Sequence, residues 1–137
     1  MFSGSFGRTV DLMRRGMDVA VVRRNVIANN LANAETPEFK RTVVNFESEL
    51  ARALASERVK PPVQFLSDPR HIPFYQPRDY RSVRPRQVLD YLSTAKNNGN
   101  NVDVEEEGML AQQNQLLYQT LATAIGAQYN LVDLVLR

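Results

Sequence analysis

The chain of 137 residues contains no cysteine, no tryptophan and a single histidine, His71. Without cysteine, thiolate nucleophiles, Cys/His zinc sites and cysteine-held clusters are excluded, and any serine triad would have to use His71. The longest aliphatic runs are far shorter than the ~20 apolar residues that a membrane-spanning helix needs. We therefore expect a protein that is not an enzyme, with no catalytic site, metal site or cofactor and no direct membrane span.

Charge is distributed unevenly along the chain. Residues 1–35 carry five arginines and three acidic residues, residues 36–100 carry eleven basic and seven acidic residues, and residues 101–137 carry five acidic residues and one arginine. Segments of opposite charge can attract each other or a neighbouring molecule. Charged side chains from Arg8 to Asp18 also interrupt any apolar core of a cleavable signal peptide, so we expect any export to use another route.

Long helices are predicted at both ends of the chain. Six of the seven prolines lie between Pro61 and Pro85, which leaves the ends free of helix-breaking residues. Apolar side chains recur there at spacings of three and four, and a second apolar stripe beside each makes the surface wider than one partner helix covers. The two main stripes are Val10, Met13, Met17, Ala20, Ile27 and Leu31, and Leu110, Leu117, Leu121, Ala124, Leu131 and Val135.

The middle of the chain is predicted to be irregular. Asn45 is a candidate N-cap for a short helix over about residues 46–57. The prolines that follow permit only short extended pieces, such as residues 63–66, and at most a small hairpin.

The predicted fold is mainly α. A helix in residues 1–35 and a helix in residues 101–137 pair as a coiled-coil-like hairpin that forms one core domain, and the proline-rich residues 36–100 join them. Because two helices alone cannot cover such wide apolar faces, we expect other copies or other proteins to complete the core.

The end of the first predicted helix is rich in asparagine: Asn25, Asn29, Asn30 and Asn33. Asparagine is a poor helix former, and Thr36 before Pro37 favours extended backbone, so local effects explain why the helix stops. Asn25, Asn29 and Asn33 also lie one turn apart and form an amide ladder that could cross-link helices. The sequence leaves both interpretations open.

The start of the second long helix carries a run of carboxylates. Asn98-Gly99 predicts a turn and Asp103 an N-cap, with residues 105–107, all glutamate, in the first helical turn. Carboxylates there interact favourably with the helix dipole, which is a sufficient explanation of the run. A specific cation or an arginine partner is the alternative.

Two motifs resemble a known family. The asparagine-rich helix end followed by Thr36-Pro37 and Phe39 resembles the N-terminal signature of the flagellar rod and hook proteins. The runs over residues 98–107 and 114–119, with His71-Ile72-Pro73 between them and the helix signature, resemble its short proximal-rod member. Glu38 departs from the glycine usual at its position, and Gly108 departs within the second helix.

This resemblance implies a structural subunit of the bacterial flagellar basal body. Such a subunit would be exported unfolded through the flagellar type III apparatus, without a cleaved signal peptide, and assembled at the base of the rod in the periplasm. Its terminal helices would pack into a helical tube that transmits torque and lines the export channel. The implied partners are other copies, other rod proteins, the adapter protein FliE, and components of the MS ring and export gate.

We expect the assembly interface to consist of the two apolar stripes and a set of polar and loop residues. That set is Asn25, Asn29, Asn30, Asn33, Thr36, Pro37, Phe39, Asn114 and Tyr118.

Three alternatives compete with this interpretation. A helical adaptor or scaffold unrelated to flagella shares every periodicity argument. A nucleic-acid-binding module would use basic residues near tyrosines, but the middle segment is also acidic and lacks a recognition motif, so we expect no nucleic acid as a partner. A hydrolase or lyase would need His71, or a pair such as Asp68 and Asp79, and we expect His71 to be a structural or exposed ring instead.

Overall fold

The computed structural model describes residues 4–59, 65, 67–68, 70–72, 76–93 and 96–136. The chain divides into two compact units, one formed by Met1–Val44 with Gln87–Arg137 and the other by Asn45–Arg86. Most of the extended piece expected at residues 63–66, and Pro73 of the histidine-containing motif, lie outside the described residues.

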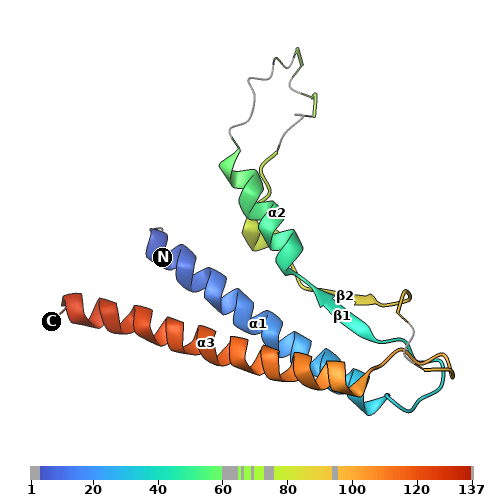
Figure 1. Ribbon diagram of the computed structural model, residues 1–137. Coiled ribbons are helices and arrows are strands. Elements are labelled where there is room, and N and C mark those ends of the chain that lie inside the picture. The colour runs from blue at the N-terminus through green and yellow to red at the C-terminus, as the bar shows by residue number, and fades with distance from the viewer. Residues whose placement is uncertain are drawn as a thin grey trace. The chain divides into compact units, whose positions relative to one another are not determined.

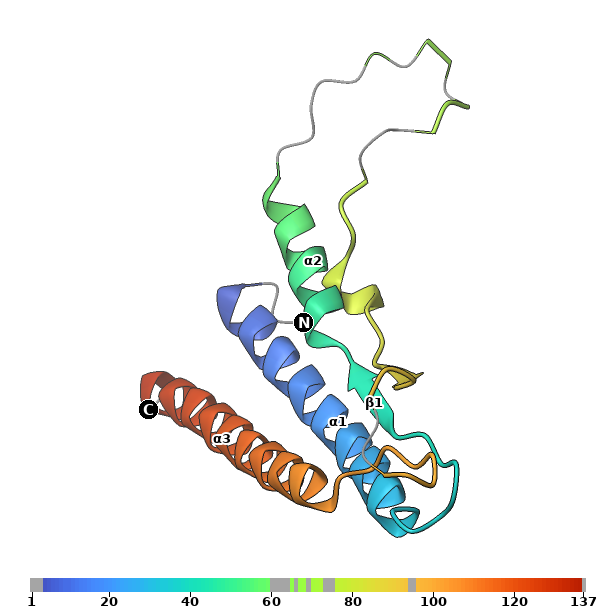
Figure 2. The ribbon, with the colours of Figure 1, turned by 45° about the vertical axis from the view of Figure 1, so that its right-hand side comes forward.

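The first unit is built on two long helices that lie side by side. Helix α1 spans Ser5–Ala32 and helix α3 spans Val104–Leu136, and they run antiparallel (Figures 1 and 2). The Leu121 methyl carbon Cδ1 comes so close to Gly16 that a Cβ there would stand 3.0 Å from it. The rings of Phe6 and Tyr129 meet edge to face at 6.2 Å. The predicted pairing of the terminal helices is therefore confirmed.

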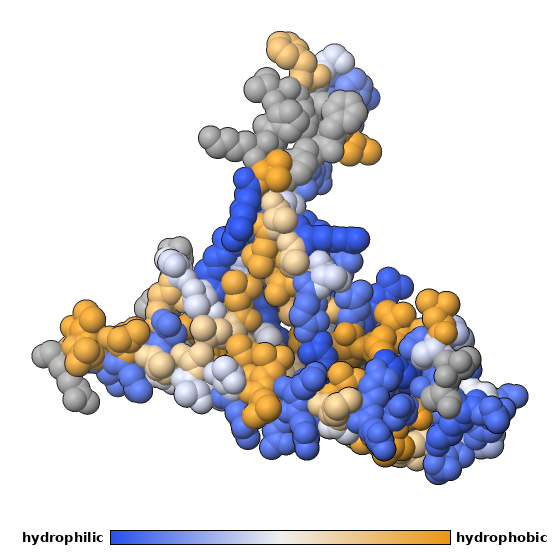
Figure 3. All heavy atoms as spheres, viewed as in Figure 1, coloured by the Kyte–Doolittle hydropathy of each residue, from blue (hydrophilic) through white to orange (hydrophobic). Residues whose placement is uncertain are grey.

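The core of this unit is concentrated at one end of the helix pair. Its buried apolar side chains come from the second half of α1 and from the loops at that end: Val19, Ala20, Val26, Ile27, Ala34 and Val102. The last turns of α3 are instead exposed, with Leu134 at 72% and Val135 at 84% of their full accessibility. Hydrophobic side chains accordingly gather on the surface at the C-terminal end of α3 (Figure 3).

The helix boundaries follow from local capping. Asp103 Oδ1 accepts hydrogen bonds from the backbone N–H groups of Glu105 and Glu106, at 2.9 and 3.3 Å, which confirms the predicted N-cap of α3. At the end of α1, the Asn33 side chain donates to the backbone oxygen of Asn29 at 2.8 Å. The asparagine-rich segment thus helps to end the helix, as the local interpretation predicts.

Two short strands border the middle of the chain. Strand β1 spans Thr42–Asn45 and strand β2 spans Arg86–Leu89, and they pair into a two-stranded sheet. The strands run antiparallel (Figure 1), and the Asp90 N–H continues the pairing by donating to the Arg41 oxygen at 2.9 Å. No tight turn connects the two strands, because residues 46–85 lie between them in the chain.

The second unit packs a helix against a short turn of 3₁₀ helix. Helix α2 spans Glu47–Arg58 and η1 spans Tyr80–Ser82. Side chains from both elements and from their flanks are buried: Phe46, Ala53, Tyr80 and Val83. The predicted N-cap at Asn45 is wrong, because Asn45 is the last residue of β1 and the cap position falls on Phe46. The Asn45 oxygen Oδ1 instead accepts from the Ser48 hydroxyl at 2.6 Å.

None of the helices in the described part of the chain combines the length and the apolar character needed to cross a membrane.

The turn after Pro37 provides a test of the fold. Glu38 has a φ of 57°, a left-handed conformation that costs L-residues about 1–2 kcal/mol, whereas glycine adopts it freely. We expect Glu38→Gly to raise the free energy of unfolding, measured by urea titration with circular dichroism. The gain should be at most about 1 kcal/mol, because glycine also loses more entropy on folding. Gly99→Ala, at a φ of 79°, is the opposing variant and should destabilise the chain. A loss of stability in Glu38→Gly would contradict this account.

Candidate assembly interface and its polar junction

Asn100 joins the loop that follows α1 to the loop that precedes α3. Its Nδ2 group donates to the backbone oxygens of Asn33 and Thr36, at 2.9 and 2.7 Å, and its Oδ1 accepts from the Val102 N–H at 2.7 Å. The side chain is fully buried. The two sequence motifs that carry the family resemblance therefore meet in space, although they lie more than sixty residues apart in the chain.

Asn101 connects the same loop to the strands. Its Oδ1 accepts from the Arg41 N–H at 2.6 Å, and its Nδ2 group donates to the Asp90 oxygen at 2.6 Å. Because Arg41 and Asp90 are themselves paired across the end of the sheet, the one amide bridges both strands. A buried side chain here supplies the polar partners that the end of a two-stranded sheet would otherwise lack.

Asn30 extends this network from α1. Its Oδ1 accepts from the Thr42 N–H at 3.0 Å and its Nδ2 group donates to the Thr42 oxygen at 2.9 Å, so one amide pairs with both backbone groups of a strand residue. The Nδ2 group also donates to Glu107 Oε1 at 3.1 Å. We call the network of Asn30, Arg41, Asn100, Asn101 and Glu107, all buried except the half-buried Arg41, the polar junction.

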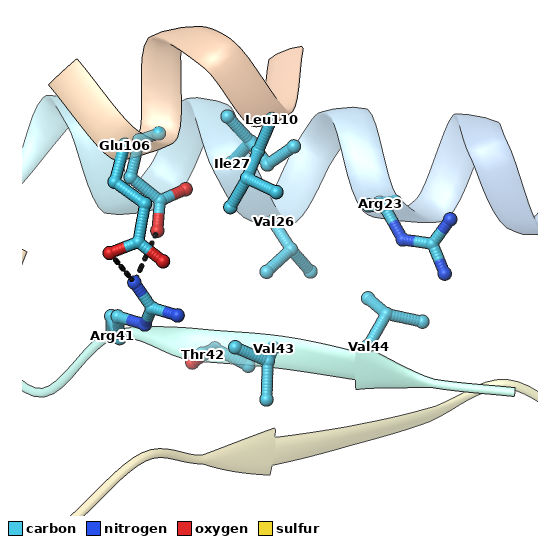
Figure 4. Close-up of a pocket in the computed structure, with 10 residues that line it drawn as sticks. Arg23, Val26, Ile27, Arg41, Thr42, Val43, Val44, Glu106 and Leu110 are labelled. Atoms are coloured by element: carbon cyan, nitrogen blue, oxygen red, sulfur yellow. Dashed lines mark ion pairs between the residues drawn. The ribbon is translucent and has the colours of Figure 1, made fainter. Parts of the chain in front are cut away.

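The charged part of the polar junction is a cluster around Arg41. The guanidinium lies 2.8 Å from a Glu106 oxygen, 3.8 Å from Glu107 Oε1 and 3.3 Å from an Asp90 oxygen. Glu106 reaches down from the first turn of α3 to Arg41, just before β1 (Figure 4), and Glu107 from the same turn contacts the same guanidinium. The arginine-partner alternative is thus correct for Glu106 and Glu107, and the simpler explanation from the helix dipole is insufficient, because Glu107 is only 1% exposed.

Burial and hydrogen bonding shift the pKa values of two carboxyl groups in this cluster. Desolvation raises the pKa of Glu107, and the Asn30 hydrogen bond and the Arg41 charge only partly oppose that effect. Its second oxygen, Oε2, is buried without a hydrogen-bond partner among the described residues. The pKa of Asp90 is lowered instead, mainly by hydrogen bonds from the Ser93 hydroxyl and the Leu92 N–H, with a smaller contribution from Arg41.

A small cavity lies beside the cluster, between α1, α3 and β1. It has a volume of about 240 Å³ and an apolar lining that includes Val26, Ile27 and Val43. Arg23 and the Arg41 cluster lie toward its two ends (Figure 4). A lining of this kind suits an apolar side chain. Within the described residues, no group of three or more acidic or histidine side chains could hold a metal ion.

The predicted interface residues are divided between the core and the surface. Four are buried: Ala20, Ile27, Asn30 and Asn114. The half-buried ones are Val10, Met13, Met17, Leu31, Asn33, Phe39, Leu110, Leu121 and Ala124. The exposed ones are Asn25, Asn29, Thr36, Pro37, Leu117, Tyr118, Leu131 and Val135. Their role in assembly stays a prediction, and only the half-buried and exposed groups have surface to offer a partner.

Sequence reasoning missed Arg41, Asn101 and Glu107 as members of one site. No periodic pattern connects them, since they come from a strand, a loop and a helix start. One signal was available in the sequence. Asn100 and Asn101 stand directly before the apolar Val102 and the N-cap Asp103. A turn at this point does not need two adjacent amide side chains, which indicates a second role for them.

The candidates for catalysis serve local structure. Asp68 and Asp79 each accept a hydrogen bond at 2.8 Å from the backbone N–H two residues ahead, the pattern of an Asx turn. His71 is exposed, and its ring nitrogen Nδ1 lies 3.4 Å from the Ser67 hydroxyl.

Comparison with known proteins finds one family. A family model described as flagella basal body rod protein matches residues 14–40. The chain is 37% identical over 132 residues to the flagellar basal body rod protein FlgB of Borreliella burgdorferi, which covers 96% of this chain and 98% of that protein. It is 38% identical over 132 residues to FlgB of Borrelia hermsii, with the same coverage of both chains. It is 30% identical over 132 residues to FlgB of Bacillus subtilis, covering 96% of this chain and 95% of that one.

Asn100→Ala tests the polar junction. The change removes three hydrogen bonds and leaves the buried Val102 N–H and two backbone oxygens without that partner, so we expect a loss of about 2–3 kcal/mol in the free energy of unfolding. Asn25→Ala, at an exposed asparagine of α1, is the matched control and should change the stability little. Urea titration of both variants measures the difference, and equal effects would contradict a structural role for Asn100.

Glu107→Gln tests the desolvated carboxyl. Because its pKa is raised in the folded chain, Glu107 takes up a proton on folding as the pH falls from 7 toward 4.5, the ordinary pKa of a glutamate side chain. The wild-type chain should therefore gain stability relative to Glu107→Gln over that range, as measured by urea titration at several pH values. Glu105→Gln removes an exposed carboxylate from the same turn and is the control. A difference between wild type and Glu107→Gln that is independent of pH would show that the carboxyl is not desolvated.

Proposed function

The chain belongs to the FlgB family of flagellar basal body rod proteins, and we propose that it is a subunit of the proximal rod whose terminal helices pack lengthwise into the tube wall. It is a structural protein of the flagellar basal body. In this proposal the helices contact other copies of the chain and other rod proteins, transmit torque through their packing and line the export channel.

The observation that carries this proposal is the incomplete core of the helix pair. The register set by Phe6 with Tyr129 and Gly16 with Leu121 places Leu131 opposite the first residues of α1. The last turn of α3 therefore has no described residue of α1 opposite it. Exposed apolar side chains continue along α3 from one end to the other: Met109, Leu116, Leu117, Tyr118, Tyr129, Leu131, Leu134, Val135 and Leu136.

A surface of this kind favours assembly over a solitary state. Apolar side chains at helical spacing gain roughly 1.5–3 kcal/mol each when a partner covers them fully. In the proposed wall, the exposed face of α3 in one copy meets a different surface of the next, and such heterologous contacts, when they do not close, generate helical arrays. This geometry supports a tube rather than a closed dimer.

Membership of the family also supports a proposal for the position and partners of the subunit. We propose that it lies at the base of the rod in the periplasm, beside the adapter protein FliE and components of the MS ring and export gate. We also propose that the flagellar type III apparatus exports it without cleavage of a signal peptide. Charged residues between Arg8 and Asp18 support that route, since they interrupt any apolar leader.

Leu131→Asp separates assembly from folding. Leu131 is 57% exposed, so an aspartate there should leave the circular dichroism of the isolated chain almost unchanged. Covered by a partner, the same charge would cost several kcal/mol, so a deletion strain that expresses this variant should lack rods in electron micrographs and should not swim. Asn130→Asp adds the same charge at the neighbouring polar position and should restore motility. Rods in the Leu131→Asp strain, or full motility of the deletion strain itself, would contradict the proposed function.

A further inference from the structure

The loop before α3 carries an asparagine-glycine pair in an exposed turn. The Gly99 N–H donates to the Lys96 oxygen at 3.3 Å, and the Lys96 N–H donates to the Asn100 oxygen at 3.0 Å. Gly99 has a φ of 79°, so the pattern matches the three-residue hairpin loop in which a left-handed residue follows a type I turn. Asn98 occupies the third position of this turn, directly before the glycine, and both residues are exposed to water.

An asparagine that precedes glycine can react with its own backbone. The nitrogen of Gly99 attacks the side-chain carbonyl carbon Cγ of Asn98 and loses its proton, and the side-chain –NH2 group takes up a proton and leaves as ammonia. The product is a five-membered cyclic imide. A water molecule from the solvent then opens the imide and yields either aspartate or isoaspartate. Glycine favours the attack because it has no Cβ to obstruct the approach of its nitrogen.

The folded turn restrains both groups that this reaction needs. The Gly99 N–H is engaged with the Lys96 oxygen, so the nitrogen keeps its proton. The Asn98 side chain is fixed as well, because its Oδ1 accepts a hydrogen bond from the Asn100 N–H at 3.1 Å. Attack needs a deprotonated nitrogen that is turned toward Cγ, so both hydrogen bonds must break and the turn must open first.

Contacts with the loop that follows α1 keep the turn closed. The Glu38 N–H donates to the Asn98 oxygen at 3.1 Å, and Lys40 Nζ donates to the Gly99 oxygen at 2.6 Å. The two loops touch here, since a Cβ on Gly99 would stand 3.5 Å from the Cα of Glu38. The adjacent Asn100 side chain is fully buried in the polar junction and anchors the end of the turn. Opening therefore requires the loss of contacts between two segments that are distant in sequence.

We propose that Asn98 is a site of self-modification that the fold controls: the folded turn suppresses attack by Gly99, and the unfolded chain undergoes it. Isoaspartate lengthens the main chain by one atom and turns the backbone oxygen that Glu38 binds into part of a free carboxylate. The hairpin loop cannot then re-form with its original hydrogen bonds. The proposed export of an unfolded chain would expose this site, but the chemistry goes beyond the proposed function and does not depend on it.

Mass spectrometry of peptides from the full chain tests the site. The chain is incubated in mildly alkaline buffer, once folded and once unfolded in guanidinium chloride, and the conversion of each asparagine is followed with time. In the unfolded chain, Asn98 should react at least about tenfold faster than Asn130, a barrier difference of about 1.4 kcal/mol, because the side chain of Leu131 hinders attack at Asn130. Gly99→Ala should remove this advantage in guanidinium chloride, where its effect on folding is irrelevant. Equal rates at Asn98 and Asn130 in the unfolded wild type would overturn the site.

The same time courses test control by the fold. Folded wild type should convert Asn98 at least about tenfold more slowly than the unfolded chain, which corresponds to an opening free energy of about 1.4 kcal/mol. Asn100→Ala should raise the rate in the folded chain and leave the unfolded rate unchanged, because it removes the buried anchor of the turn. Asn25→Ala is the control and should alter neither rate. Equal rates at Asn98 in folded and unfolded wild type would overturn control by the fold.

The effect of the product is measured on the separated forms. The isoaspartate form should unfold at a lower urea concentration than Asn98→Asp, which carries the same added charge on an unaltered main chain. Equal urea midpoints would overturn the claim that the longer main chain disrupts the turn. None of these results bears on whether rods depend on the gene, so failure here is distinguishable from failure of the proposed function.

Discussion

The carboxylate of Glu107 is the constraint around which the first unit is organised. An acidic group that is almost fully removed from water is costly unless donors and a positive charge reach it. Asn30 from α1 and Arg41 from the start of β1 supply them, and Glu106 and Asp90 hold the arginine in place. Because these groups come from four separate segments, helix register, strand position and loop path are fixed together.

This arrangement divides the helix pair into two functional ends. At the junction end, buried apolar side chains and satisfied amides define a single conformation, and Asn100 and Asn101 tie both loops to it. At the opposite end, Phe6 and Tyr129 touch but most of the last turn of α3 faces solvent. A subunit built in this way can keep its fold at one end while partners complete the other, as the proposed assembly into a tube requires.

The sequence predicts the helices well because their causes are local. Proline-free ends, apolar periodicity and Asp103 at the cap position require no knowledge of the rest of the chain. The polar junction depends instead on residues far apart in sequence, so Glu107 is indistinguishable from its exposed neighbour Glu105 until the strand carrying Arg41 is placed. Asn45 fails as a helix cap for the same reason, because its pairing in the sheet is decided by β2 about forty residues later.

The same distinction separates the two roles of the asparagine-rich signature. Asn30 is buried and serves the fold. Asn33 ends α1, and its backbone oxygen accepts a hydrogen bond from Asn100. Asn25 and Asn29 are exposed on a different side of these turns from Asn30, and within the chain only Asn33 donates hydrogen bonds to Asn29. A helix that presents amides on two different faces can bind its own loops with one face and another molecule with the other. The asparagine-rich signature therefore serves the fold through Asn30 and Asn33, and in the proposed function its exposed members Asn25 and Asn29 serve assembly.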